Sequence, residues 1–176
     1  MDAARIELKL ALDEAGLPSL KLQTFSERLN VQKRIYLIQT LGYDLGYRFS
    51  WYLRGPYSRH LTDDAFALRN ELDAGDTDAD GFLLAESAKQ SIVRAHQLWT
   101  LPQGTSVQPD AWLEVLASLH YLKEVAYWPS SADKSFDAVF AKLIESKPQF
   151  TDRKELAKQA WDRLAEYFLI HSHATA

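Results

Sequence analysis

An acidic loop has the spacing that most resembles a metal site. Three aspartates and a glycine stand at the positions 1, 3, 5 and 6 of a calcium-binding loop: Asp76, Asp78, Asp80 and Gly81. Position 12 of such a loop needs a carboxylate that binds calcium through both oxygens. Ser87 occupies that position, and Glu86 comes one residue early. We therefore expect no calcium site in the loop 73–81.

The five histidines are too scattered along the chain to define a metal site. No two have the i, i+4 spacing of a metalloprotease helix, and the chain has no cysteine that could ligate zinc. His171 and His173 flank one residue in the tail and lack a fixed third ligand. His96 and His120 fall on or beside apolar helical faces. We therefore predict no metal ion and no cofactor.

Residue types found in catalytic triads occur together at 58–64. Ser58 and His60 precede Asp63 and Asp64, but side chains at i and i+2 of a helix point to different sides. Ser58 is better explained as a helix-start residue, and the two aspartates as first-turn acids that complement the helix dipole. The sequence also lacks a glycine-rich phosphate loop and a GxSxG motif, so we predict no catalytic residue.

A basic and aromatic segment is the strongest candidate for a functional site. A strand face, the turn after it and the next helix start bring together Arg48, Ser50, Tyr52, Arg54, Tyr57 and Arg59. Guanidinium groups beside a helix N-terminus suit a phosphate or a carboxylate, and Tyr beside Arg is typical of protein-interface hot spots. An equally weighted alternative is that Arg48 and Arg54 pair with acids such as Asp63, Asp64 or Glu71 and only stabilise the fold.

Composition and charge narrow the class of protein. A chain of 176 residues with 47% hydrophobic and 25% charged residues suits one globular domain. The net charge of −4 hides a segregation, since residues 21–60 sum to +5 and residues 61–80 to −6. The overall acidity argues against a protein that coats nucleic acid without specificity. No apolar run reaches the roughly 20 residues of a membrane span, and the start lacks signal-peptide features, so we expect a cytoplasmic protein without membrane contact.

Helical periodicity covers most of the chain. A capping box at 24–27 marks the firmest helix start, and Gly42 or Gly46 ends that helix. The spacing of apolar residues predicts seven helices in all, at about 3–15, 25–41, 61–72, 85–99, 110–126, 136–143 and 151–168.

The period changes from helical to alternating over 47–53. Aromatic and apolar side chains there alternate with polar ones, which predicts a strand with one buried face. We expect Gly55-Pro56 to turn the chain and 82–84 to supply a second strand, because a lone strand is not stable. The uncharged, breaker-rich segment 101–109 is the one clear linker, and it is too short to separate two independent domains.

Three segments carry a resemblance to a known family: 31–39 (VQKRIYLIQ), 47–58 (YRFSWYLRGPYS) and 61–64 (LTDD). Over about residues 24–65 the chain resembles the uncharacterised YwgA-like proteins of bacteria and archaea. It is more distantly similar to the Panacea antitoxin domain, which shares a "QK-xx-Y" helix followed by a strand and a Gly-Pro turn. The resemblance implies a winged-helix-like core and no known catalysis. Antitoxin activity is implied only by the more distant relative.

These observations predict a mainly α protein with a small β-hairpin. A winged-helix-like unit at about 20–100 is expected to pack on a helical C-terminal part at about 110–170, within a single compact domain covering 1–176. The predicted function is a non-enzymatic binding module, regulatory or antitoxin-like, that recognises a partner protein such as a toxin or effector through the 48–59 surface.

Two other functions remain open at the level of sequence. In a winged-helix DNA-binding transcriptional regulator, the helix with Arg59, or the helix with Lys33 and Arg34, would enter the major groove. A hydrolase or metal-dependent enzyme is the third alternative.

Overall fold

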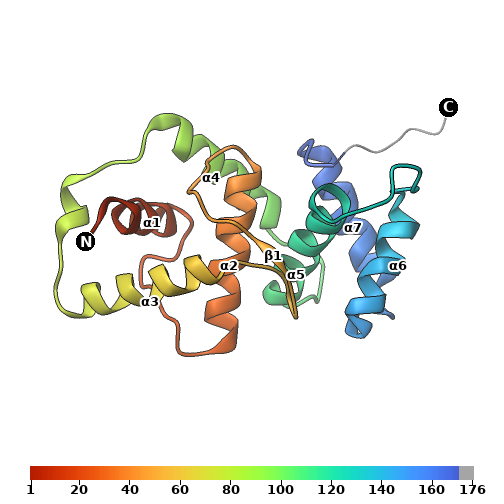
Figure 1. The fold of residues 1–176 in the computed structure, drawn as a ribbon, viewed down its shortest axis with the longest axis horizontal. Coiled ribbons are helices and arrows are strands. Elements are labelled where there is room, and N and C mark those ends of the chain that lie inside the picture. The colour runs from red at the N-terminus through yellow and green to blue at the C-terminus, as the bar shows by residue number, and fades with distance from the viewer. Residues whose placement is uncertain (171–176) are drawn as a thin grey trace. The chain divides into compact units, whose positions relative to one another are not determined.

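A computed structural model describes residues 1–170 of the chain, which are mainly helical with one small antiparallel sheet (Figure 1). The α-helices are α1 (Ala3–Glu14), α2 (Phe25–Thr40), α3 (Arg59–Asp73), α4 (Glu86–Trp99), α5 (Pro109–His120), α6 (Phe136–Ser146) and α7 (Lys154–Glu166). The two strands are β1 (Ser50–Tyr52) and β2 (Gly55–Tyr57). Three shorter helical turns are η1 (Asp78–Gly81), η2 (Tyr121–Val125, a π-helix) and η3 (Pro148–Phe150).

The chain divides into two compact units. The first unit contains 1–50 and 57–97, and the second contains 51–56 and the chain from 98 onward. The helix before residue 20 therefore belongs to the first unit, whereas the middle of the hairpin belongs to the second. The chain passes from one unit to the other for the last time at Gln97 and Leu98, before the linker 101–109. That the whole chain folds as a single domain stays a prediction.

The first unit is built on a predicted helix start. The Thr24 hydroxyl accepts from the Glu27 N–H and the Glu27 carboxylate accepts from the Thr24 N–H, so the expected capping box opens α2. Helix α3 packs on α1 and α2, and η1 packs on α1. The core of this unit is aliphatic and includes Leu8, Leu12, Ile35, Leu37, Ile38, Leu61, Leu68 and Ile92.

The second unit is built around α5. Every side chain from 112 to 120 is buried, because α5 packs on α6 and α7 at once. The sequence of this helix is apolar on almost all sides, as expected for a helix inside a core. Three of its buried residues are nevertheless polar or charged: Glu114, Ser118 and His120.

The predicted strand pairing is wrong, because both strands come from one hairpin. β1 pairs with β2, and the turn between them lies at Leu53 and Arg54 instead of at Gly55-Pro56. Gly55 has a φ of 88°, which only glycine adopts readily, and this suits the residue that follows a tight hairpin turn. Residues 82–84 form no strand, and Leu53, predicted on the buried face, is exposed.

The remaining boundaries agree with the sequence to within a few residues. The segment 101–108 has no regular structure, and the expected break at Trp128 and Pro129 follows the π-helical turn η2. His171 and His173 lie outside the described residues. Among residues 1–170 no helix combines the length and apolar character that crossing a membrane requires.

Candidate functional site: an anchored hairpin tip

The tip of the β-hairpin presents three exposed side chains, Tyr52, Leu53 and Arg54, which we call the hairpin tip. Tyr52 is 58% exposed and Leu53 75% exposed, and half of the Arg54 side chain is accessible. A hairpin turn is normally occupied by small or polar residues. A large aliphatic side chain at this position removes no apolar surface from water, so folding does not explain its presence.

A buried ion pair holds the hairpin tip in place. The Lys147 Nζ donates to the Leu53 carbonyl at 2.5 Å and to the Glu114 Oε1 at 3.0 Å. The Arg54 Nη1 donates to the other carboxylate oxygen of Glu114 at 3.1 Å, and the Gln149 Nε2 lies at 3.5 Å from Glu114 Oε1. One carboxylate on α5 therefore connects the turn of the hairpin to the segment after α6. We call Glu114 and Lys147 the anchor pair.

Aromatic rings cover the cation of the anchor pair. The Lys147 Nζ lies 5.2 Å from the centre of the Trp51 ring, within the range of a cation–π contact. The Trp51 ring in turn packs against Tyr121, with 5.6 Å between the centroids. Trp51 stands in β1 and Tyr121 at the start of η2, so the rings also connect the hairpin to the end of α5.

Burial dominates the electrostatics of the anchor pair. Lys147 is 1% exposed and Glu114 2%. Loss of solvent lowers the pKa of Lys147, and the attraction and hydrogen bond of Glu114 oppose that shift. A buried charge is tolerated only when it is paired and hydrogen-bonded. Because Lys147 finds these partners when the Leu53 carbonyl and Glu114 are in their present positions, the arrangement fixes one geometry of the hairpin tip.

Two glutamines on α2 hold the ends of the segment that contains the hairpin. The Gln32 amide donates to the Ser58 carbonyl and accepts from the Ser58 N–H, both at 2.8 Å. The Gln39 amide does the same for Tyr47, at 2.8 and 3.0 Å. These residues are seven positions apart, or two helical turns, so they lie on one side of α2. Both pairs belong to the first unit.

The predicted basic and aromatic surface is divided between the units. Tyr52 and Arg54 belong to the second unit, whereas Arg48, Ser50, Tyr57 and Arg59 belong to the first. In the first unit, Arg48, Ser50 and Arg59 are exposed, and Tyr57 is half-buried.

The alternative in which Arg48 and Arg54 pair internally applies to Arg54 alone, and with another acid than expected. Arg59, which this alternative did not include, faces Asp63 at 3.8 Å. Arg54 pairs with Glu114, and Glu71 accepts from Arg5 instead. Arg48 forms no hydrogen bond or ion pair with a residue from 1 to 170.

The predicted DNA contacts on α2 lie in unsuitable positions. Lys33 is buried, and the Arg34 Nη1 donates to the Ala15 carbonyl at 2.5 Å. Neither side chain therefore projects from α2 as a groove-reading residue would.

The triad-like residues at 58–64 serve the helix start instead. Ser58 is the buried N-cap of α3, and its hydroxyl accepts from the Leu61 N–H, as the sequence suggested. His60 is exposed and lies 3.5 Å from Asp64, which also accepts from the Tyr47 hydroxyl at 2.9 Å. Burial and this hydrogen bond raise the pKa of Tyr47.

The acidic loop binds the first residue of the chain. The ammonium of Met1 donates to Asp76 at 2.8 Å and to Asp78 at 2.6 Å, and Asp78 begins the turn η1. Across the described part of the chain, acids and histidines form no group of three that could hold a metal ion.

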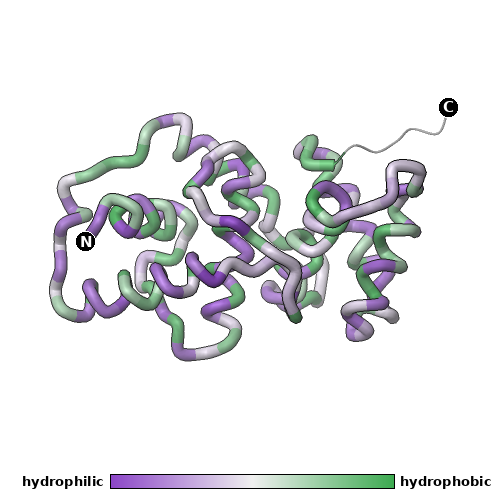
Figure 2. Tube along the Cα trace, in the orientation of Figure 1, coloured by the Kyte–Doolittle hydropathy of each residue, from purple (hydrophilic) through white to green (hydrophobic). Residues whose placement is uncertain are grey.

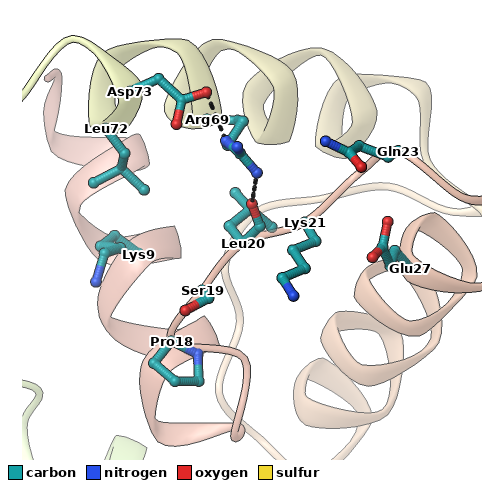
Figure 3. Close-up of a pocket in the computed structure, with 10 residues that line it drawn as sticks. All are labelled: Lys9, Pro18, Ser19, Leu20, Lys21, Gln23, Glu27, Arg69, Leu72 and Asp73. Atoms are coloured by element: carbon teal, nitrogen blue, oxygen red, sulfur yellow. Dashed lines mark hydrogen bonds and ion pairs between the residues drawn. The ribbon is translucent and has the colours of Figure 1, made fainter.

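A polar cavity of about 580 Å³ lies in the first unit, between α1, the segment 18–23, α2 and α3 (Figure 3). Arg69 closes one side of it by donating to the Leu20 carbonyl at 2.6 Å and to Asp73 at 2.8 Å. Lys9 pairs with Asp13, and Glu27 belongs to the capping box. Most of the lining charges are thus paired within the fold.

Sequence reasoning missed the anchor pair and the two glutamines. Lys147 is 33 positions from Glu114 and 94 from Leu53, and no local pattern connects such distant residues. The one available signal was Glu114 itself, a carboxylate between apolar residues on both sides. A charge in such a helix must find a partner somewhere in the fold.

Comparisons of the chain with known proteins found no relative. No family model, no curated protein and no solved structure matches the chain.

Proposed function

We propose that the chain is a non-enzymatic binding module that recognises a partner protein through the hairpin tip. The observation that carries the proposal is an exposed Tyr52-Leu53-Arg54 turn whose backbone is held by a buried ion pair. Aromatic and arginine side chains dominate interface hot spots, and a surface that is already ordered loses less entropy on binding. Tyr52 and Arg54 supply both residue types beside an exposed leucine.

The chemistry of the hairpin tip favours a protein over a small molecule. Its side chains project from a convex turn, whereas small ligands occupy concave pockets. A convex apolar tip beside a guanidinium fits a partner pocket with apolar walls and an acidic border. A regulatory or antitoxin-like role, in which this module binds and controls a second protein, needs no more than such a contact.

A winged-helix arrangement remains part of this proposal, with the hairpin as its wing. We do not extend it to DNA binding through α2, because Lys33 is buried and the Arg34 guanidinium donates to the Ala15 carbonyl. DNA binding through α3, where Arg59 is exposed, remains the second candidate function. An enzymatic role has no observation in its favour, since Ser58 caps a helix.

Site-specific photo-crosslinking tests the proposal. A photoreactive phenylalanine analogue replaces Leu53 in the full chain. This variant is expressed in cells of the organism that encodes the protein and is then irradiated. We expect one discrete crosslinked protein from position 53 and none from Glu155, an exposed residue of α7 that serves as the matched control. No discrete product at 53, or the same product from both positions, would overturn the proposal.

A further inference from the structure

A second exposed apolar segment lies in the first unit, between η1 and α4. Phe82 is 56% exposed and Leu83 87%. The backbone of Phe82 is extended, with φ −113° and ψ 153°. Figure 2 shows this segment as a hydrophobic stretch that follows the hydrophilic acidic loop. Adjacent large apolar side chains exposed together on an extended backbone are unusual, because burial of each would stabilise the fold by roughly 1.5–3 kcal/mol.

Both ends of the exposed segment are fixed. The turn η1 precedes it, packs on α1 and buries Ala79. Helix α4 begins at Glu86, directly after it, and buries Ala88 in its first turns. The four residues 82–85 thus span two ordered elements without joining the sheet, which contains β1 and β2 alone among the described residues.

Carboxylates border the segment on both sides. Asp80 precedes Phe82, Glu86 follows Ala85, and both are exposed. Neither forms an ion pair with any residue from 1 to 170. Asp78 adds a third carboxylate, which is shared with the Met1 ammonium. No lysine or arginine occurs between Arg69 and Lys89, so every charged side chain of 70–88 is acidic.

We propose that residues 80–86 form a second docking segment, which binds a protein with an apolar groove bordered by lysine or arginine. An extended segment can lie along such a groove, where main-chain groups pair with the partner and side chains enter its pockets. Phe82 and Leu83 supply the apolar contacts, and Asp80 and Glu86 pair with the border cations. This docking segment is independent of the hairpin tip and carries the opposite charge.

A peptide titration of the full chain tests the docking segment. The probe is a short, fluorescently labelled peptide of alternating lysine and leucine, followed by fluorescence anisotropy. Two comparison peptides replace every leucine by serine, or every lysine by glutamate. We expect the lysine–leucine peptide to bind at least about tenfold more tightly than either comparison peptide, a difference of about 1.4 kcal/mol.

Variants of the chain then locate the binding. Leu83→Ser should weaken binding of the lysine–leucine peptide by about tenfold. Val93 is an exposed apolar residue of α4, and Val93→Ser should leave this affinity unchanged. Equal binding of the lysine–serine peptide would mean that charge alone acts and would overturn the proposal. So would an unchanged affinity of Leu83→Ser, or an equal loss in Val93→Ser. Because none of these measurements involves the hairpin tip, they leave the proposed function untouched.

Discussion

A buried carboxylate needs a cation near it, and Glu114 has two, Lys147 inside the second unit and Arg54 at its surface. Each of the three residues also depends on the others. Without Glu114, Lys147 would be a buried charge with only the Leu53 carbonyl and the Trp51 ring as partners. The ion pair therefore contributes less to net stability than to the choice of one geometry for the hairpin tip.

Replacing one member of the anchor pair should lower the free energy of unfolding far more than replacing both. We expect Lys147→Met to lower the free energy of unfolding by about 3–5 kcal/mol, because it leaves the Glu114 carboxylate buried with a half-exposed partner. The double variant Lys147→Met with Glu114→Leu should recover a large part of that loss. Denaturant titrations of the two single variants and the double variant measure this coupling. A loss below about 1 kcal/mol for Lys147→Met would contradict it.

A buried histidine makes stability depend on pH. Burial lowers the pKa of His120 from 6.5 to about 4 in the folded protein. Below pH 6.5 the unfolded chain therefore binds a proton that the folded chain does not, so stability is complete above 6.5 and is lost as the pH falls toward 4. Between these values the slope should reach about 1.4 kcal/mol per pH unit.

His120→Gln is the matched variant for this pH effect. Its free energy of unfolding, measured by urea titration at several pH values from 7 to 5, should be nearly constant where the wild type declines. Parallel pH profiles of the two proteins would show that His120 is not the titrating group.

At the scale of elements, local signals predicted the helices and failed for the sheet. The capping box of α2 and the buried Ser58 at the start of α3 are contained in a few neighbouring residues, so sequence alone located them. The pairing of β1 with β2 was missed because Gly55 and Pro56 both favour turns. Gly55 in fact follows the turn, and Pro56 stands within a strand at the edge of a two-stranded sheet.

The end of α7 holds a strained residue that sequence reasoning did not anticipate. Phe168 has a φ of 57° and is exposed, in a position where helices usually place glycine. Its N–H donates to the Ala165 carbonyl and the Leu169 N–H to the Leu164 carbonyl, both at 3.0 Å, which is the Schellman motif. A side chain in this conformation costs about 1–2 kcal/mol.

Phe168→Gly should relieve this strain. We expect the variant to raise the free energy of unfolding by about 1 kcal/mol, because glycine adopts the left-handed conformation freely and the ring contributes little burial. Phe168→Ala keeps the strain and should stay within about 0.5 kcal/mol of the wild type. Thermal or chemical unfolding of both variants measures these stabilities. A glycine variant less stable than the wild type would contradict the prediction, because it would mean that the Phe168 ring packs against the protein.

At the scale of the whole molecule, the sequence predicted the helical class and not the division of the chain. Compact units depend on contacts between distant residues, and the assignment of 51–56 to the second unit rests on such contacts, Leu53 with Lys147 and Arg54 with Glu114. The same reason explains the candidate site. Sequence patterns found the exposed Tyr52 and Arg54, whereas the anchor pair beneath them needed the folded chain.

The segment 101–109 is uncharged and short, so we expect the chain to unfold in one transition and limited proteolysis within this segment not to release two stable parts. Digestion at several protease concentrations, with the fragments identified by mass and tested for folding by circular dichroism, checks it. Two fragments that are each folded after a cut between 101 and 109 would refute it.

The central claim is that the hairpin tip is kept for binding and not for folding, and the affinity of the crosslinked partner tests it most directly. We predict that Leu53→Ser weakens binding of that partner by at least about 2 kcal/mol, or roughly 30-fold. The free energy of unfolding of the variant should stay within about 0.5 kcal/mol of the wild type. Glu155→Ser should change neither quantity. Unchanged affinity in Leu53→Ser, or a loss of binding accompanied by an equal loss of folding stability, would contradict the account.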